Sequence, residues 1–187
     1  MISSIRGQQD AGKTALEVGF IRRLLANGQR WPDGYRPDDV IVNYALKIDG
    51  CHCINNQQMR EYIKKTVKTG IRHKIIGITE ADRVFPARFW QDRGQSEALI
   101  GLWQDVKLFN QVFWDAHIGT GVDVMLRDTR QRAYIPKYNK HFDLIEYIMI
   151  DSYNMKVDTY RKISIEISSS VILYIPFGKI VAIMDCK

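Results

Sequence analysis

Short apolar runs alternate with helical patterns over the first 140 residues of the chain. Apolar runs with the length of buried strands lie at residues 1–5, 40–42, 74–80, 111–117 and 132–135. Strands with little polar alternation are typical of parallel sheets that are covered on both faces. Patterns with a wide apolar face predict helices at about 15–28, 55–68, 96–108 and 122–128. The order β-α-β-α-β-α-β-α-β predicts an α/β fold with a mainly parallel central sheet and helices on both faces.

The pattern changes after residue 143. Apolar positions at 144, 147–150, 157, 163, 165, 167 and 171–175 suggest antiparallel strands added to one edge of the sheet. The chain has 187 residues, the usual length of one domain, and contains no internal repeat or interdomain linker. We therefore expect a single domain over 1–187, with a core at 1–140 and a C-terminal β-rich edge extension at 141–187.

A glycine-rich motif stands between the first predicted strand and the first predicted helix. Residues 7–14, GQQDAGKT, match G-x-x-x-x-G-K-[ST] at every fixed position, in the strand–loop–helix context that the motif requires. Backbone N–H groups of such a loop wrap a polyphosphate, and the helix N-terminus adds the positive end of its dipole. The alternative is an ordinary glycine turn before a helix. The match at all four fixed positions of the motif disfavours this alternative. The predicted nucleotide-binding residues are Gly7, Gln8, Gln9, Asp10, Ala11, Gly12, Lys13, Thr14 and Ala15.

Composition and charge change this picture little. Lys and Arg number 27 against 21 acids, and the net charge of +6 is compatible with a nucleic acid partner but is weak evidence alone. Cys51 and Cys53 lack the second ligand pair of a structural zinc site. No signal peptide opens the chain, and the apolar stretch at 171–184 is shorter than the roughly 20 residues of a spanning helix. We expect a soluble protein.

A nucleotide-hydrolysing loop needs carboxylates on a neighbouring strand, one to organise Mg²⁺ and one to polarise the attacking water. The run at 74–80 ends in Glu80, which we predict to be the water-polarising base. A surface acid at the end of the sheet is the alternative. Lys13 would reach the β- and γ-phosphates, and the Thr14 hydroxyl would bind Mg²⁺.

Three segments carry a family resemblance: residues 79–90, residues 102–105 and residues 116–128. Together with the P-loop they resemble the FtsK/HerA superfamily of P-loop ATPases that pump DNA. Within it, the chain looks most like the genome-packaging ATPases of viruses with internal membranes, and more distantly like zonula occludens toxin-like ATPases. The resemblance covers about residues 1–140 and implies a RecA-like fold and ATP hydrolysis coupled to DNA translocation by a ring, expected to be a hexamer.

The resemblance also assigns roles to residues. Gly12, Lys13 and Thr14 match the phosphate and Mg²⁺ positions, and Glu80 matches the second acid of the Walker B pair. The end of the strand at 111–117 matches the sensor position beside the γ-phosphate, a role that His117 or Asp115 could fill, although a lone histidine is more often a packed or surface residue. The implied cofactors are ATP and Mg²⁺.

The chain departs from the family pattern at two positions. Thr79 stands where the family carries the aspartate that holds Mg²⁺, and Asp115 stands where a small polar sensor residue is expected. Because these two strands are neighbours in a RecA-like sheet, we hypothesise that the Mg²⁺-organising carboxylate has moved from position 79 to Asp115. The alternative is that Asp115 is incidental and hydrolysis is slow.

Arginines and aromatic residues alternate in the loop after Glu80. Arg side chains neutralise phosphates and aromatic rings stack on bases, so this loop could contact DNA. Packing of the aromatic rings under solvated arginines is the alternative. The candidate nucleic-acid-binding residues are Arg83, Arg88, Phe89, Trp90 and Arg93. Ring ATPases also place an arginine of one subunit against the neighbour's γ-phosphate, for which Arg88, Arg93 and Arg127 are candidates.

These features predict a Mg²⁺-ATP-dependent DNA translocase, most plausibly a viral packaging motor. Its expected partners are double-stranded viral DNA, further copies of the chain in a ring, and capsid or membrane vertex proteins. Its expected location is the host cytoplasm or the virion. Two rivals stay open: a small P-loop kinase with an arginine-rich lid, and an ATP-binding assembly factor without turnover, which Thr79 makes credible.

Overall fold

The computed structural model describes residues 1–28, 34–69, 73–89, 93–105, 110–116, 121–139, 141 and 144–151. Within them the chain forms one seven-stranded sheet with the strand order β3-β2-β4-β5-β1-β6-β7. The strands are β1 (Ile2–Ile5), β2 (Val40–Val42), β3 (His52–Cys53), β4 (Ile75–Ile78), β5 (Gln111–Asp115), β6 (Arg132–Asn139) and β7 (Leu144–Asp151). Neighbouring strands from β3 to β6 are parallel, and β7 is antiparallel to β6.

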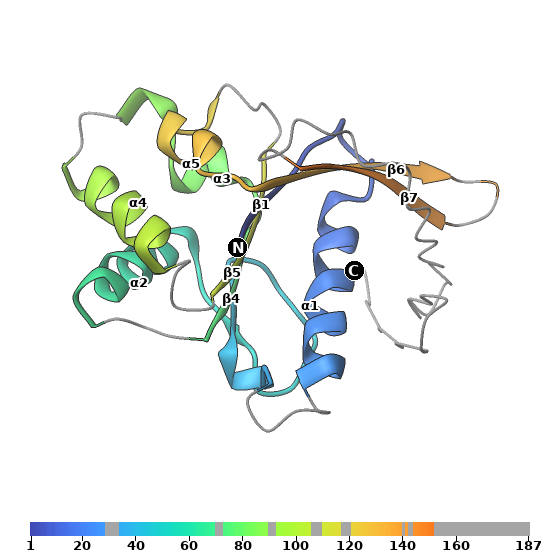
Figure 1. Ribbon diagram of the computed structural model, residues 1–187, viewed down its shortest axis with the longest axis horizontal. Helices are drawn as coiled ribbons and strands as arrows, with labels where there is room; N and C mark the ends of the chain where they lie inside the picture. The colour runs from blue at the N-terminus through green and yellow to red at the C-terminus, as the bar shows by residue number, and fades with distance from the viewer. Residues whose placement is uncertain are drawn as a thin grey trace.

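Helices cover both faces of the sheet (Figure 1). Helix α1 (Lys13–Gly28) lies on one face, and the other face carries α2 (Asn56–Thr69), α3 (Ala81–Val84), α4 (Arg93–Asp105) and α5 (Val124–Asp128). Short 3₁₀ turns at Pro37–Asp39 and Ala87–Phe89 precede β2 and α4. None of the helices in the described part of the chain is long and apolar enough to cross a membrane.

The core is divided by the sheet into two layers. On the side of α2 and α4, Ile76, Trp114 and Phe85 are fully buried among the apolar residues of the helices. On the side of α1, Ile21 packs against Phe113 and other strand residues. Each of these side chains contributes about 1.5–3 kcal/mol of burial free energy, so the alternating strand faces hold both helical layers against the sheet.

The predicted α/β fold, its mainly parallel sheet and the antiparallel addition at one edge are confirmed. The structure adds β3 and α3, which sequence analysis did not predict, and extends the strand predicted at 132–135 to Asn139. Strand β3 has two exposed residues and no apolar pattern, so only its pairing with β2 defines it. Residues 152–187 lie outside the described residues, and the single-domain organisation over 1–187 stays a prediction.

A buried acid joins α1 to the sheet. Glu17 is fully buried, and its Oε1 accepts a hydrogen bond from the Tyr44 hydroxyl at 3.0 Å. A Cβ atom on Gly77 would collide with Glu17 Oε1, so the glycine in the middle of β4 makes room for this carboxyl. Burial raises the pKa of Glu17 well above its usual value, and the negative charge of Asp115 raises it further. The hydrogen bond from Tyr44 acts in the opposite direction.

The buried carboxyl predicts a pH dependence of stability. A folded state with a raised acid pKa binds more protons than the unfolded state, so stability falls as pH rises from the unfolded pKa near 4.5 through the raised pKa. Glu17→Gln keeps an acceptor for Tyr44 and removes the ionisation. As pH rises through this window, the free energy of unfolding of Glu17→Gln minus that of the wild type should therefore increase by up to about 1.4 kcal/mol per pH unit.

Urea unfolding at several pH values between about 4.5 and 8.5 measures this difference, because the window opens at the unfolded carboxyl pKa. Glu97→Gln, which removes an exposed acid of α4, is the matched control and should show no comparable trend. A constant difference between Glu17→Gln and the wild type would contradict the prediction.

Candidate functional site

The P-loop occupies the carboxyl edge of the sheet, between the end of β1 and the start of α1 (Figure 1). Gly12 has φ of +83°, and a Cβ atom there would lie 2.6 Å from Ile145 Cδ1 of β7. Glycine at this position therefore serves both the left-handed backbone and the close approach of β7. Gln8, Gln9 and Asp10 are exposed on the outer side of the loop.

Lys13 folds back onto its own loop. Its side chain is buried, and Nζ donates hydrogen bonds to the carbonyl oxygens of Gly7 at 3.2 Å and Gln8 at 3.0 Å. Thr14 follows in the first turn of α1, where unpaired N–H groups and the helix dipole favour an anion. The loop thus surrounds the Lys13 ammonium group. Phosphate oxygens can replace the two carbonyl oxygens as its hydrogen-bond acceptors.

Glu80 reaches the same edge from another strand. Strand β4 is parallel to β5, which is parallel to β1, so the segments after β4 and β1 both leave the carboxyl edge. One intervening strand separates them by about 10 Å, two strand spacings. A triphosphate held by the P-loop would extend along this edge toward Glu80.

The Glu80 backbone is held in an uncommon conformation. Its φ of 50° and ψ of 50° are left-handed, which costs energy for a residue with a side chain. The Glu80 carboxylate forms an ion pair with Arg83 Nη1 at 3.0 Å and is about one third exposed. In this arrangement Oε2 of the carboxylate is paired with Arg83, one turn along the chain.

Asp115 supports the Glu80 turn from the neighbouring strand. It is the last residue of β5, pairs in register with Ile5 of β1 and is 4% exposed. Its Oδ1 accepts a hydrogen bond from the Glu80 N–H at 2.9 Å. The predicted neighbourhood of β4 and β5 is therefore confirmed, while the role of Asp115 toward Mg²⁺ stays a prediction.

Asn43, which sequence analysis did not select, supports the turn from the opposite side. It follows β2, and its Oδ1 accepts from the Thr79 N–H at 2.7 Å while its Nδ2 donates to the Thr79 carbonyl at 2.8 Å. A polar residue at the carboxyl end of an apolar strand was the available signal. Glu17 was also missed, and its signals were an acid within an apolar helix and Gly77 within an apolar strand.

Several predicted residues lie away from the P-loop or outside the described residues. Arg83 pairs with Glu80, and Arg88 is exposed in the following 3₁₀ turn. Phe85 is fully buried in the core, so it does not stack on a base. The structure describes only the backbone of Phe89 and Arg93, whereas Trp90 and His117 lie outside the described residues.

Arg127 lies on α5, close to the start of the P-loop. Burial lowers the pKa of Arg6, and the charges of Arg130 and Arg127 lower it further. Arg6 directly precedes Gly7, so the three guanidinium groups gather beside the loop. Arg130 Nη1 donates to the Arg127 carbonyl at 2.7 Å, which fixes the end of α5. The positive charges of Arg127 and Arg130 therefore lie close to Arg6, the residue before the P-loop of the same chain.

The side chains at the edge are chemically suited to Mg²⁺. Thr14 and Asp115 offer oxygen donors, the ligand type that Mg²⁺ prefers. Mg²⁺ with a nucleotide is commonly held by one or two protein groups and by phosphate oxygens. In the described part of the chain no three His, Cys, Asp or Glu side chains gather into a metal cluster.

Comparison with known proteins gives structural neighbours only. No family model and no curated protein matches the chain. The N-terminal domain of zonular occludens toxin from Neisseria meningitidis is similar with a TM-score of 0.59 and 19% identity, over 90% of this chain and 95% of that one. The genome packaging NTPase B204 from Sulfolobus turreted icosahedral virus 2, in complex with AMP, has a TM-score of 0.59 and 9% identity, over 87% and 97%.

The flagellar accessory protein FlaH from Methanocaldococcus jannaschii has a TM-score of 0.54 and 11% identity, over 89% of this chain and 85% of that one. These identities are low, and the shared feature is the fold. Together with the P-loop at the carboxyl edge of a mostly parallel sheet, the neighbours establish that this chain has the RecA-like fold of P-loop NTPases.

Proposed function

We propose that the protein is a Mg²⁺-dependent ATPase of the FtsK/HerA type that moves DNA, most plausibly a viral genome-packaging motor. The observation that carries the proposal is the position of Glu80 on the same sheet edge as the P-loop, with the single strand β5 between the two. The fold shared with a genome packaging NTPase supports it. The complexes of that protein with AMP and ATP-gammaS support ATP as the nucleotide here.

The proposed chemistry follows from the edge geometry. The P-loop N–H groups and Lys13 bind the phosphates, with Lys13 exchanging the carbonyls of Gly7 and Gln8 for phosphate oxygens. Thr14 and Asp115 would hold Mg²⁺, which neutralises charge on the β- and γ-phosphates when bound. Glu80 would leave Arg83 and orient the attacking water.

Assembly would complete the motor. A hexameric ring would bring Arg88 or Arg93 of one subunit to the γ-phosphate of its neighbour. Arg127 is less suited to this role because it gathers with Arg6 beside its own P-loop. The exposed Arg88 and the loop around it would face double-stranded viral DNA. Capsid or vertex proteins would be further partners, in the host cytoplasm or the virion.

Two observations favour a second function. The Glu80–Arg83 ion pair and Thr79 in the aspartate position would both slow hydrolysis. A chain that kept this arrangement with ATP bound would act as an ATP-binding assembly factor. Tight binding of ATP without turnover is the expected result for that alternative.

Substitution of the two main residues separates binding from hydrolysis. We expect Lys13→Ala to weaken ATP binding at least about tenfold because a phosphate partner is lost. Glu80→Gln should bind ATP about as well as the wild type but hydrolyse it about 10²–10⁴-fold more slowly, since the base is lost. Calorimetric binding and phosphate release measure the two effects, with Glu97→Gln as control. Wild-type turnover by Glu80→Gln would remove Glu80 from the mechanism.

The shifted-carboxylate hypothesis predicts a change in Mg²⁺ dependence. Asp115→Asn can still accept the Glu80 N–H, so the turn is kept while a ligand charge is removed. The Mg²⁺ concentration for half-maximal ATPase activity should rise about tenfold or more, equivalent to about 1.4 kcal/mol. Adding Thr79→Asp to this variant should recover part of the loss. Full activity of Asp115→Asn at low Mg²⁺ would end the hypothesis.

The motor function itself is tested by adding DNA. ATPase activity should rise severalfold with double-stranded DNA in the absence of any acceptor, and light scattering with nucleotide should report a ring. Turnover that requires a small-molecule acceptor would identify a kinase instead. Nucleotide binding with no turnover under either condition would favour the assembly factor.

A further inference from the structure

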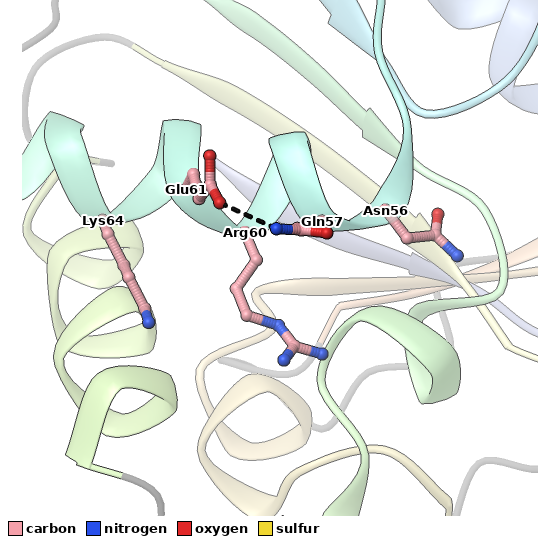
Figure 2. A pocket seen from close by; sticks show the side chains of 5 residues that line it. All are labelled: Asn56, Gln57, Arg60, Glu61 and Lys64. Carbon is pink, nitrogen blue, oxygen red and sulfur yellow. Dashed lines mark hydrogen bonds between the residues drawn. The ribbon is translucent and has the colours of Figure 1, made fainter.

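Helix α2 carries a polar groove on the side from which Arg60 and Lys64 project (Figure 2). The groove has a volume of about 400 Å³ and is lined by Asn56, Gln57, Arg60, Glu61 and Lys64. This volume is large enough for one or two phosphodiester groups but too small for a folded protein segment. The groove lies on the same side of the sheet as α3, the short helix that follows Glu80.

The charge of the groove favours an anion. Of the residues that line the groove, Arg60 and Lys64 are cations and Glu61 is the one acid. Glu61 Oε1 accepts a hydrogen bond from Gln57 Nε2 at 3.1 Å, which occupies part of its carboxylate. Figure 2 shows the side chains of Arg60 and Lys64 projecting from the same side of the helix. The phosphate groups of a nucleic acid backbone match this pair of neighbouring cations.

Two hydrogen-bonded connections lead from the groove to Glu80. In the first, Asn56 Oδ1 accepts from Asn43 Nδ2 at 2.7 Å, and Asn43 in turn holds the N–H and the carbonyl of Thr79. The amide of Asn43 thus bonds the groove and the residue before Glu80 at the same time. A change at Asn56 reaches the Glu80 turn through a single side chain.

In the second connection, Arg60 donates from Nε and Nη2 to the Val84 carbonyl at 3.0 and 2.6 Å. Val84 ends α3, and Glu80 precedes the first residue of that helix. The segment between Thr79 and Val84 is therefore bonded at both ends to side chains that belong to the groove or touch it. Because the Glu80 backbone is left-handed, these bonds help to keep it in a conformation it would otherwise leave.

We propose that the α2 groove binds the phosphodiester backbone of a nucleic acid and that its occupancy is transmitted to Glu80 through Asn56, Asn43 and Arg60. The inference rests on the proposed ATPase function, which it deepens. A phosphate oxygen forms a stronger bond to the Arg60 guanidinium than the Val84 carbonyl does. Its binding would loosen the end of α3 and let Glu80 exchange Arg83 for a water molecule.

The binding half of the proposal is tested by salt dependence. The affinity for a fluorescein-labelled 20-base-pair DNA is measured by anisotropy at several salt concentrations. Lys64→Gln should reduce the slope of log affinity against log salt by about one, because one phosphate contact is lost. Arg23→Gln removes the same charge from an exposed position of α1, on the other face of the sheet, and should leave the slope unchanged. Equal slopes for Lys64→Gln and the wild type would overturn the proposal.

The transmission half is tested with Asn56. Asn56→Ala keeps the groove cations but removes the acceptor of Asn43, so DNA should bind within about twofold while the ratio of DNA-stimulated to basal ATPase falls toward one. Asn56→Asp keeps that acceptor and should retain a ratio above that of Asn56→Ala at saturating DNA. A merely structural role of Asn56 would not distinguish the two variants by this ratio. An undiminished ratio in Asn56→Ala would overturn the transmission.

The outcomes separate this site from the proposed function. A chain without ATP turnover whose DNA affinity still depends on Lys64 would refute the ATPase and support the groove. An active ATPase whose slope of log DNA affinity against log salt is the same in Lys64→Gln and the wild type would refute the groove alone. Protection of α2 from hydrogen exchange at high protein concentration, without DNA and not increased by it, would assign the groove to a second copy of the chain and overturn the proposal.

Discussion

The hydrogen bonds that hold the turn after β4 between its two neighbouring strands are the constraint on which the candidate site depends. Asn43 of the β2 end binds both backbone groups of Thr79, and Asp115 of β5 accepts the Glu80 N–H. Each partner is a short side chain at the carboxyl edge of a strand, so the spacing of the parallel sheet sets the position of Glu80. Without these contacts a left-handed glutamate would relax toward a commoner conformation.

The two main charged groups of the site are both occupied by the chain itself. Lys13 is bonded to carbonyls of its own loop, and Glu80 is paired with Arg83. Both interactions are local and polar, and phosphate oxygens or water can replace them at little structural cost. The site therefore combines a fixed backbone with side chains that exchange partners, an arrangement in which a ligand shifts the population of two states.

A buried polar layer connects the P-loop helix to this edge. Glu17 on α1 meets Tyr44 and the backbone at Gly77, and the negative charge of Asp115 acts on it. These surroundings favour the protonated, uncharged form of the Glu17 carboxyl, because a second buried negative charge would be costly. Polar interactions of Glu17 therefore join helix α1, which begins with Lys13, to β4 and β5, in addition to apolar packing.

The sequence alone determined the elements whose information is local. Eight consecutive residues specify the P-loop, and apolar runs bounded by turns specify the parallel strands, because backbone conformation and burial follow from neighbours along the chain. Glu80 was identified in the same way, from an acid at the end of such a run. Strand β3 escaped prediction because two exposed residues carry no pattern.

Tertiary structure alone decided how side chains from distant segments meet. Asn43 and Thr79 are 36 residues apart, and Tyr44 and Glu17 are 27 apart, so no periodicity along the chain encodes these bonds. The same holds for Asn56 and Arg60, which read as ordinary polar residues of an amphipathic helix until α2 is placed beside α3. Strand order, which puts β5 between β1 and β4, brings these groups to one edge because parallel strands end on the same side of the sheet.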